Sequence, residues 1–148
     1  MAVSIDDLME MSKDQLNDLF GSSPPGDIPN GDADGTTIIA PGTLFTPVIA
    51  TLINIFGWQG KTFDAASGTL VNRITFFGLQ AIIAEVYLRK SWFDGNESLV
   101  LDYSKTSLIA EWVRDEIRLI APQLYPGITY WKDEKTIFFA LQFGDSSE

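Results

Sequence analysis

The sequence has no cysteine and no histidine among its 148 residues. Their absence excludes disulfide bonds, thiolate catalysis, histidine general bases, haem ligation through histidine and the usual zinc sites. Glycine-rich phosphate loops are missing as well, and DADG at 32–35 lacks the downstream glutamate of a calcium loop. We therefore expect no cofactor and no metal, and any chemistry must come from carboxylates, Tyr, Lys, Arg, Ser, Thr or the backbone.

Long apolar runs are also missing. No stretch of about 18 apolar residues occurs, and residues 1–15 are acidic, where a signal peptide would be basic and then apolar. These features predict a cytoplasmic protein without a membrane span. The apolar content of 45% is enough to bury a core without disulfides or metal.

Acidic charge is concentrated near the N-terminus. Residues 1–35 carry −7 of the net charge of −10, from eight acids and Lys13, which leaves −3 for residues 36–148. The nine basic residues of this second part are scattered, with no Lys/Arg stripe between aromatic residues to follow a phosphate backbone. Nucleic acid is therefore not expected as a partner.

The N-terminal residues 4–23 have the pattern of an amphipathic helix. Ser4 or Asp6 is available as a cap and Gly21 as a stop, and a second cap at Ser12 allows a break. A helix packed across the outside of the body is the favoured interpretation, ahead of an arm that binds a partner.

The following residues 24–35 are rich in Pro, Gly, Asn and Asp, which predicts only turns and extended coil. We therefore divide the chain into an acidic helix with a strap, 1–35, and a single domain, 36–148. A short apolar helix is predicted at about 46–56, with Pro47 at its first position.

From Lys61 onward the pattern is that of β-strands. Runs rich in Val, Ile, Leu, Phe, Thr and Tyr are separated by short turn clusters. Such a series predicts an antiparallel meander, which hides its edges by curling into a barrel. A helical turn is predicted at 107–112, just before the strand predicted at 114–120, and a single helix over 107–120 is the main alternative there. The predicted strands are 61–64, 68–77, 81–89, 97–104, 114–120, 125–131 and 136–143.

FGWQGKTFD at 56–64 resembles the GXWXG element that opens a family of small lipocalin-like proteins, with Gly57, Trp58 and Gly60 close to that spacing but not identical to it. The segments VNRI, EVYLRKSWFDGNESLVLDYSKTS, WVRDEIRLIAPQLYPGITYW and FFALQF are similar to a second family, of small and mostly uncharacterised microbial proteins, over roughly the whole chain. The closing segment of that family reads approximately RDE-I-R-x-x-x-P-x-x-Y-x-G. The GXWXG resemblance implies a mainly β (α+β) protein with a calycin-style, lipocalin-like antiparallel β-barrel, a fold that commonly encloses apolar small molecules.

The segment WVRDEIRLIAP, 112–122, sets four charges between apolar flanks. As a strand it places Arg114, Glu116 and Arg118 on one face and Asp115 on the other. If the arginine face points outward, its ion pairs are screened and contribute under about 1 kcal/mol each. If it lines the barrel, one arginine would bind a ligand carboxylate or carbonyl while Glu116 orients it. A buried Asp115 would have a raised pKa and become a candidate general acid or base.

Glu85 interrupts an apolar strand, on the face of Ile83 and Tyr87. A carboxylate there is costly unless it is paired, so an internal pair with Arg73 or Arg118 is expected. Such a pair is also where a cofactor-free enzyme would keep its acid or base.

Tyr103 follows Leu99 and Leu101 at a two-residue period, so it is expected to point toward the core, while Asp102 is expected to cap the next turn.

Two classes of function fit this pattern. In the first, the barrel binds an apolar or partly carboxylated small molecule among aromatic side chains, with one arginine as the polar anchor. In the second, it catalyses a cofactor-independent isomerisation, cyclisation or hydration in secondary metabolism, with Glu85, Asp115 and Tyr103 as catalytic residues. A filled barrel acting as an interaction module is a third, and a homodimer is left open. The candidate ligand-binding residues are Arg73, Tyr87, Trp112, Arg114, Glu116, Arg118, Tyr125, Tyr130 and Trp131.

Overall fold

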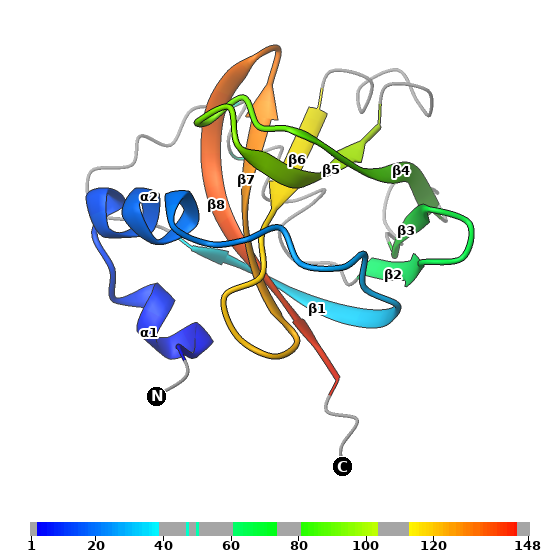
Figure 1. Ribbon diagram of the computed structural model, residues 1–148, viewed down its shortest axis with the longest axis horizontal. Helices are drawn as coiled ribbons and strands as arrows, with labels where there is room; N and C mark the ends of the chain where they lie inside the picture. Colours follow the sequence, from blue (N-terminus) through cyan, green and yellow to red (C-terminus); the bar gives the residue numbers. More distant parts are fainter. Residues whose placement is uncertain are drawn as a thin grey trace.

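The computed structural model describes residues 3–38, 47, 50, 61–73, 81–103 and 113–144, with the backbone alone for 71–73 and 81–83. Eight antiparallel strands form a closed barrel in sequence order, and the first strand pairs with the last (Figure 1). The predicted antiparallel barrel is therefore confirmed. The elements are α1 (Ile5–Met9), α2 (Lys13–Gly21), β1 (Gly31–Ile38), β2 (Lys61–Asp64), β3 (Thr69–Arg73), β4 (Ala81–Lys90), β5 (Glu97–Asp102), β6 (Val113–Ile117), β7 (Leu124–Trp131) and β8 (Glu134–Phe143).

Two short helices cover one side of the barrel. Each begins at a serine that forms a capping box with the residue three positions on, Ser4 with Asp7 and Ser12 with Gln15. The break predicted near Ser12 is therefore present. Both helices lie beside β8 (Figure 1). Their buried side chains form one cluster with residues on the outer face of β7 and β8. These helix residues are Leu8, Leu16 and Phe20.

The prediction that residues 24–35 form only turns and coil is wrong for its second half. β1 begins at Gly31 and pairs on both sides, for example Ala33 with Lys61 of β2 and with Phe143 of β8. Hydrogen bonding to two neighbouring strands outweighs the low β-propensity of Gly and Asp. DADG therefore lies inside a strand and not in a metal-binding loop.

The remaining strap crosses one end of the barrel. The Leu119 N–H donates to the Pro24 carbonyl at 2.8 Å, and the Tyr125 hydroxyl donates to the Asp27 carbonyl at 3.0 Å. Gly26 has a φ of +73°, and a Cβ there would lie 2.8 Å from the Leu119 Cβ. Both the left-handed backbone and the close packing require glycine at this position.

Residues 113–117 are a strand, so the alternative of a single helix over 107–120 is wrong. β6 ends at Ile117, three residues before the predicted end. Pro47 and Ala50 are helical, while the rest of the predicted helix 46–56 and the predicted turn at 107–112 lie outside the described residues.

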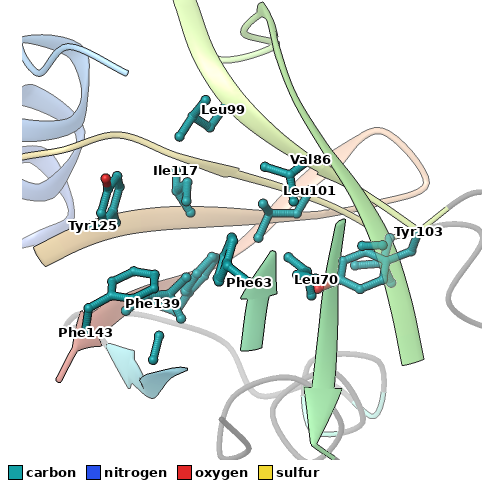
Figure 2. Packing of buried hydrophobic residues seen from close by; sticks show 14 of the residues in the cluster. Phe63, Leu70, Val86, Leu99, Leu101, Tyr103, Ile117, Tyr125, Phe139 and Phe143 are labelled. Atoms are coloured by element: carbon teal, nitrogen blue, oxygen red, sulfur yellow. The ribbon is translucent and has the colours of Figure 1, made fainter. Parts of the chain in front are cut away.

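Aromatic rings fill the interior at the strap end. Phe143 contacts Phe63 and Tyr125, with ring centroids 5.4 and 5.5 Å apart. Phe139 lies directly over Gly127, where a Cβ would come within 2.3 Å of its ring. Figure 2 shows Tyr125 and Phe143 at one end of this interior cluster and Tyr103 at the other. The end that holds Tyr103 is the one with polar side chains.

Candidate functional site

Four buried polar side chains meet inside the barrel; we call them the interior polar cluster. The Lys61 Nζ donates to the Tyr103 Oη at 3.2 Å, and the Tyr103 Oη donates to the Asp115 Oδ2 at 3.2 Å. The Thr129 Oγ1 donates to the other carboxylate oxygen, Oδ1, at 2.8 Å. All four residues are at most 1% exposed. An amine, a phenol and a carboxyl group are thus linked in an apolar surrounding.

Strand alternation explains this convergence. Phe63, Val113 and Ile117 belong to the interior core. Lys61 lies on the same face of its strand as Phe63, and Asp115 lies on the same face of its strand as Val113 and Ile117, so both point inward. The antiparallel order brings the starts of β2 and β6 to the same barrel end as the ends of β5 and β7. Tyr103 points inward as predicted.

Burial shifts the two charged groups in opposite directions. It lowers the pKa of the Lys61 ammonium from 10.5 to about 8, an effect that the charge of Asp115 partly opposes. Burial raises the pKa of the Asp115 carboxyl above its ordinary value, against the lowering effects of Lys61 and of its two hydrogen bonds. Burial therefore favours the neutral amine of Lys61 and the protonated carboxyl group of Asp115.

Thr37 adds an interior hydroxyl. It pairs with Phe139 across the β1–β8 ladder, and directly paired residues of an antiparallel ladder point to the same side, so its side chain faces the interior. Its Oγ1 is buried and has no hydrogen-bond partner among the described residues. An unpaired buried hydroxyl costs about 1–3 kcal/mol, which makes it a candidate contact for a bound polar atom.

The free energy of unfolding is expected to rise with pH between about 8 and 10. The unfolded chain keeps the Lys61 proton up to an ordinary pKa of 10.5, while the folded chain releases it at about 8. In this window the unfolded state binds more protons, so raising the pH favours the folded state, whereas below pH 8 the cost of the buried ammonium is fully present.

Urea unfolding from pH 7 to 10 measures this slope. Lys61→Met should flatten it, whereas Lys90→Met, which removes an exposed lysine, should not. The series stops at pH 10 because ionisation of tyrosines such as Tyr87, whose pKa burial raises to about 12, then acts in the opposite direction. Equal slopes in the wild-type protein and the Lys61 variant would contradict the shift.

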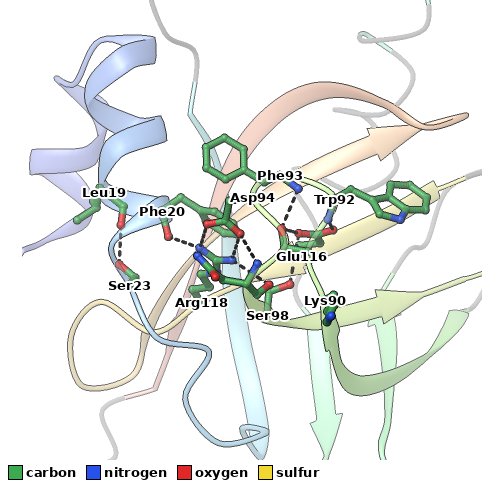
Figure 3. A network of polar contacts seen from close by, with 12 residues as sticks. Leu19, Phe20, Ser23, Lys90, Trp92, Phe93, Asp94, Ser98, Glu116 and Arg118 are labelled. Carbon is green, nitrogen blue, oxygen red and sulfur yellow. Dashed lines mark hydrogen bonds and ion pairs between the residues drawn. The ribbon is translucent and has the colours of Figure 1, made fainter.

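The arginine face of 112–122 lies outside the barrel. Glu116 is fully buried there and accepts hydrogen bonds from the Ser98 Oγ at 3.3 Å, from the Trp92 N–H at 2.9 Å and from the Ser91 hydroxyl. Its pairing with Arg114 is confirmed, at 2.9 Å. These contacts hold the β4–β5 connection against β6 (Figure 3). Neither residue faces the interior, so the prediction of an arginine anchor inside the barrel is not supported.

Arg118 is also buried outside the barrel. Its guanidinium pairs with both carboxylate oxygens of Asp94, at 2.7 and 2.8 Å, and donates to the Phe20 carbonyl at 2.8 Å (Figure 3). The expected pair between Glu85 and Arg118 is therefore wrong. Glu85 is exposed, because residues 84 and 86 of β4 face the core and residue 85 faces outward.

The remaining candidates are dispersed. The Tyr87 hydroxyl donates to Asp102 on the outer surface, so Asp102 takes part in a cross-strand contact. Tyr130 also packs outside, edge-on to Trp92, while Trp131 packs against the interior core. Tyr125 closes the strap end. Trp112 and the side chain of Arg73 lie outside the described residues.

Lys61, Thr129 and Thr37 were not predicted as site residues. One signal for Lys61 was available: it stands two residues before Phe63 in the short strand KTFD, so an inward Phe63 implies an inward lysine. Thr129 and Thr37 carry no comparable signal, because threonine is common on both faces of a strand.

Among the described residues, no three acidic side chains are grouped so as to hold a metal ion, and no helix is long and apolar enough to cross a membrane.

The sequence matches no family model and no curated protein. Among solved structures, the crystal structure of a protein from Thermomonospora curvata is similar, with a TM-score of 0.61 and 16% identity over 91% of this chain and 89% of that one. Residues 56–60, which carry the GXWXG resemblance, lie outside the described residues. The similarity establishes a shared fold, and the described residues of this chain form an eight-stranded antiparallel barrel.

Proposed function

We propose that the barrel binds a small, mostly apolar molecule whose carboxylate or carbonyl oxygen lies beside Lys61. The observation that carries the proposal is the interior polar cluster itself. Burying an amine and a carboxyl group in an apolar interior costs several kcal/mol per charge. Ionisable groups whose pKa values are shifted by burial and by a specific charged partner cluster at functional sites. The anchor is therefore a lysine, in place of the arginine predicted from the sequence.

The position of the molecule follows from the packing. Aromatic rings and the strap fill one end of the barrel, so the molecule lies toward the end with Lys61 and Tyr103. Thr37 adds a buried hydroxyl on the interior face of β1, which is available to a polar atom of the molecule. If the barrel also converts the molecule to a product, Asp115 would serve as the acid/base and Tyr103 as the hydrogen-bond donor. Glu85 is exposed and would have no catalytic role.

Two fluorescent probes with the same aromatic skeleton test this function. 8-Anilinonaphthalene-1-sulfonate carries an anionic group, and N-phenyl-1-naphthylamine lacks it. Lys61→Met should weaken binding of the anionic probe at least tenfold and change binding of the neutral probe less than twofold, because only the anion contacts the ammonium. Lys90→Met should leave both affinities unchanged.

Circular dichroism at each titration point confirms that the variants stay folded. If neither probe binds the folded protein, the proposed function is wrong. If both probes bind but Lys61→Met weakens neither, Lys61 is not the anchor.

A further inference from the structure

Lys61 presents a primary amine to the inside of the barrel. It is 1% exposed, and its Nζ lies 3.2 Å from the Tyr103 Oη, which lies 3.2 Å from an Asp115 carboxylate oxygen. Among the described residues, the other lysines, at 13, 90, 132 and 135, are all exposed. Lys61 therefore differs from them in burial, in its phenol neighbour and in its carboxyl neighbour.

We propose that Lys61 forms an imine with the carbonyl carbon of an apolar aldehyde or ketone bound inside the barrel. This inference rests on the proposed function, since the carbonyl compound must first occupy the interior. It narrows the ligand to a chemical class and makes the binding covalent and reversible.

The reaction requires no oxidant, reductant or second reactant. The Lys61 nitrogen attacks the carbonyl carbon, the C–N bond forms, and a proton passes from nitrogen to oxygen to give a carbinolamine. The carbinolamine oxygen then takes a proton from the Tyr103 hydroxyl and leaves as water. The nitrogen gives up its remaining proton through the Tyr103 hydroxyl to the Asp115 carboxylate, which has by then reprotonated the phenol, so both groups return to their starting forms. The net change is one amine and one carbonyl giving one imine and one water.

The interior polar cluster supplies the proton movements of this reaction. Tyr103 contacts both Lys61 and Asp115, so a proton that the phenol gives to the leaving oxygen is replaced from the Asp115 carboxyl. Burial raises the pKa of that carboxyl, which favours the protonated form that can donate. Thr129 holds the opposite oxygen and fixes the orientation of the carboxyl group.

The amine is in a reactive state near neutral pH. Only the neutral form attacks a carbonyl, and with a pKa of about 8 roughly a tenth of Lys61 is neutral at pH 7, against under about a thousandth for an exposed lysine. Lys61 is 1% exposed, so the enclosed interior keeps water away from the imine once it has formed.

Reductive trapping tests the inference. Wild-type protein is incubated at pH 7 with trans-cinnamaldehyde and sodium cyanoborohydride, which reduces an imine to a stable amine, and the adduct is located by intact-mass and peptide mass spectrometry. Modification of Lys61 should proceed at least tenfold faster than modification of the exposed lysines. Lys61→Arg, which keeps the charge but has no primary amine, should lose the fast phase, and Lys90→Arg should keep it.

Binding of cinnamyl alcohol, which has no carbonyl group, is measured in parallel by isothermal titration. If the alcohol binds but Lys61 is trapped no faster than the surface lysines, the imine is overturned and the proposed function stands. If neither the alcohol nor the aldehyde binds, both fail. Tyr103→Phe supplies a further readout: alcohol affinity should be kept while the trapping rate falls at least fivefold, and an unchanged rate would overturn the role of Tyr103.

Discussion

Replacing Arg118 with methionine should lower the free energy of unfolding by about 3 kcal/mol, because removing one partner of a buried ion pair leaves the charge of the other partner uncompensated. The guanidinium is fully buried and contacts two segments: it pairs with Asp94 and donates to the Asn96 carbonyl at 3.3 Å, both in the β4–β5 connection, and it donates to the Phe20 carbonyl at the end of α2. It also stacks on the Phe20 ring, 4.5 Å from its centroid. Asp94 is 21% exposed, so solvent reduces the loss below the upper end of the usual range.

Urea unfolding followed by circular dichroism measures the change. Arg89→Met is the matched control: Arg89 is exposed and lies over the Tyr87 ring, so its loss should cost under about 0.5 kcal/mol. Amide hydrogen exchange in α2 should also accelerate in the Arg118 variant, since the helix loses the hydrogen bond from Arg118 to the Phe20 carbonyl. A loss below about 1 kcal/mol would mean that this buried pair does not hold the segments together.

Replacing Gly127 with alanine should destabilise the barrel by about 2–3 kcal/mol through overpacking. The new Cβ would lie 2.3, 2.6 and 2.7 Å from three atoms of the Phe139 ring, distances at which either the ring or the strand must move. Phe139 is buried in the same core cluster as Phe63, Tyr125 and Phe143, so a shift of its ring disturbs packed neighbours.

A double-mutant cycle separates this clash from other effects of the alanine. Phe139→Leu removes the overlapping ring atoms, so Gly127→Ala should cost under about 1 kcal/mol in that background. Gly144→Ala is the control, since a Cβ there meets nothing within 4 Å and should leave the unfolding midpoint unchanged. Equal costs of Gly127→Ala in the two backgrounds would place the strain elsewhere.

Strand alternation predicted most of the barrel, because runs such as TIFFALQF and ESLVLDYS carry strong β-formers at the right lengths. It failed at β1, where Gly31–Gly35 has a turn composition and only pairing with β2 and β8 makes a strand. A local sequence pattern reports only the β-propensity of the residues themselves. It therefore misses β1, whose strand conformation depends on pairing with residues distant in sequence.

For the site, alternation correctly separated Asp115 from Arg114 and Glu116 but did not say which face points inward. The outward face resembles an interior one because α2 and the β4–β5 connection bury it, as the fully buried Glu116 and Arg118 show. The contact between Lys61 and Tyr103 joins residues 42 positions apart, which no local pattern reveals.

The pairing of β1 with β8 has a consequence for how the chain folds. Its register joins Ala33 to Phe143, so the seam is made from residues near opposite ends of the described chain. Contacts of such long sequence separation form slowly, because the entropy of closing the loop is lost before the contact is made. During synthesis β1 is exposed on one side until β8 has emerged from the ribosome. Because the β1–β8 pairing closes the barrel, the enclosed interior that shields Lys61 and Asp115 from water is complete only once that pairing has formed.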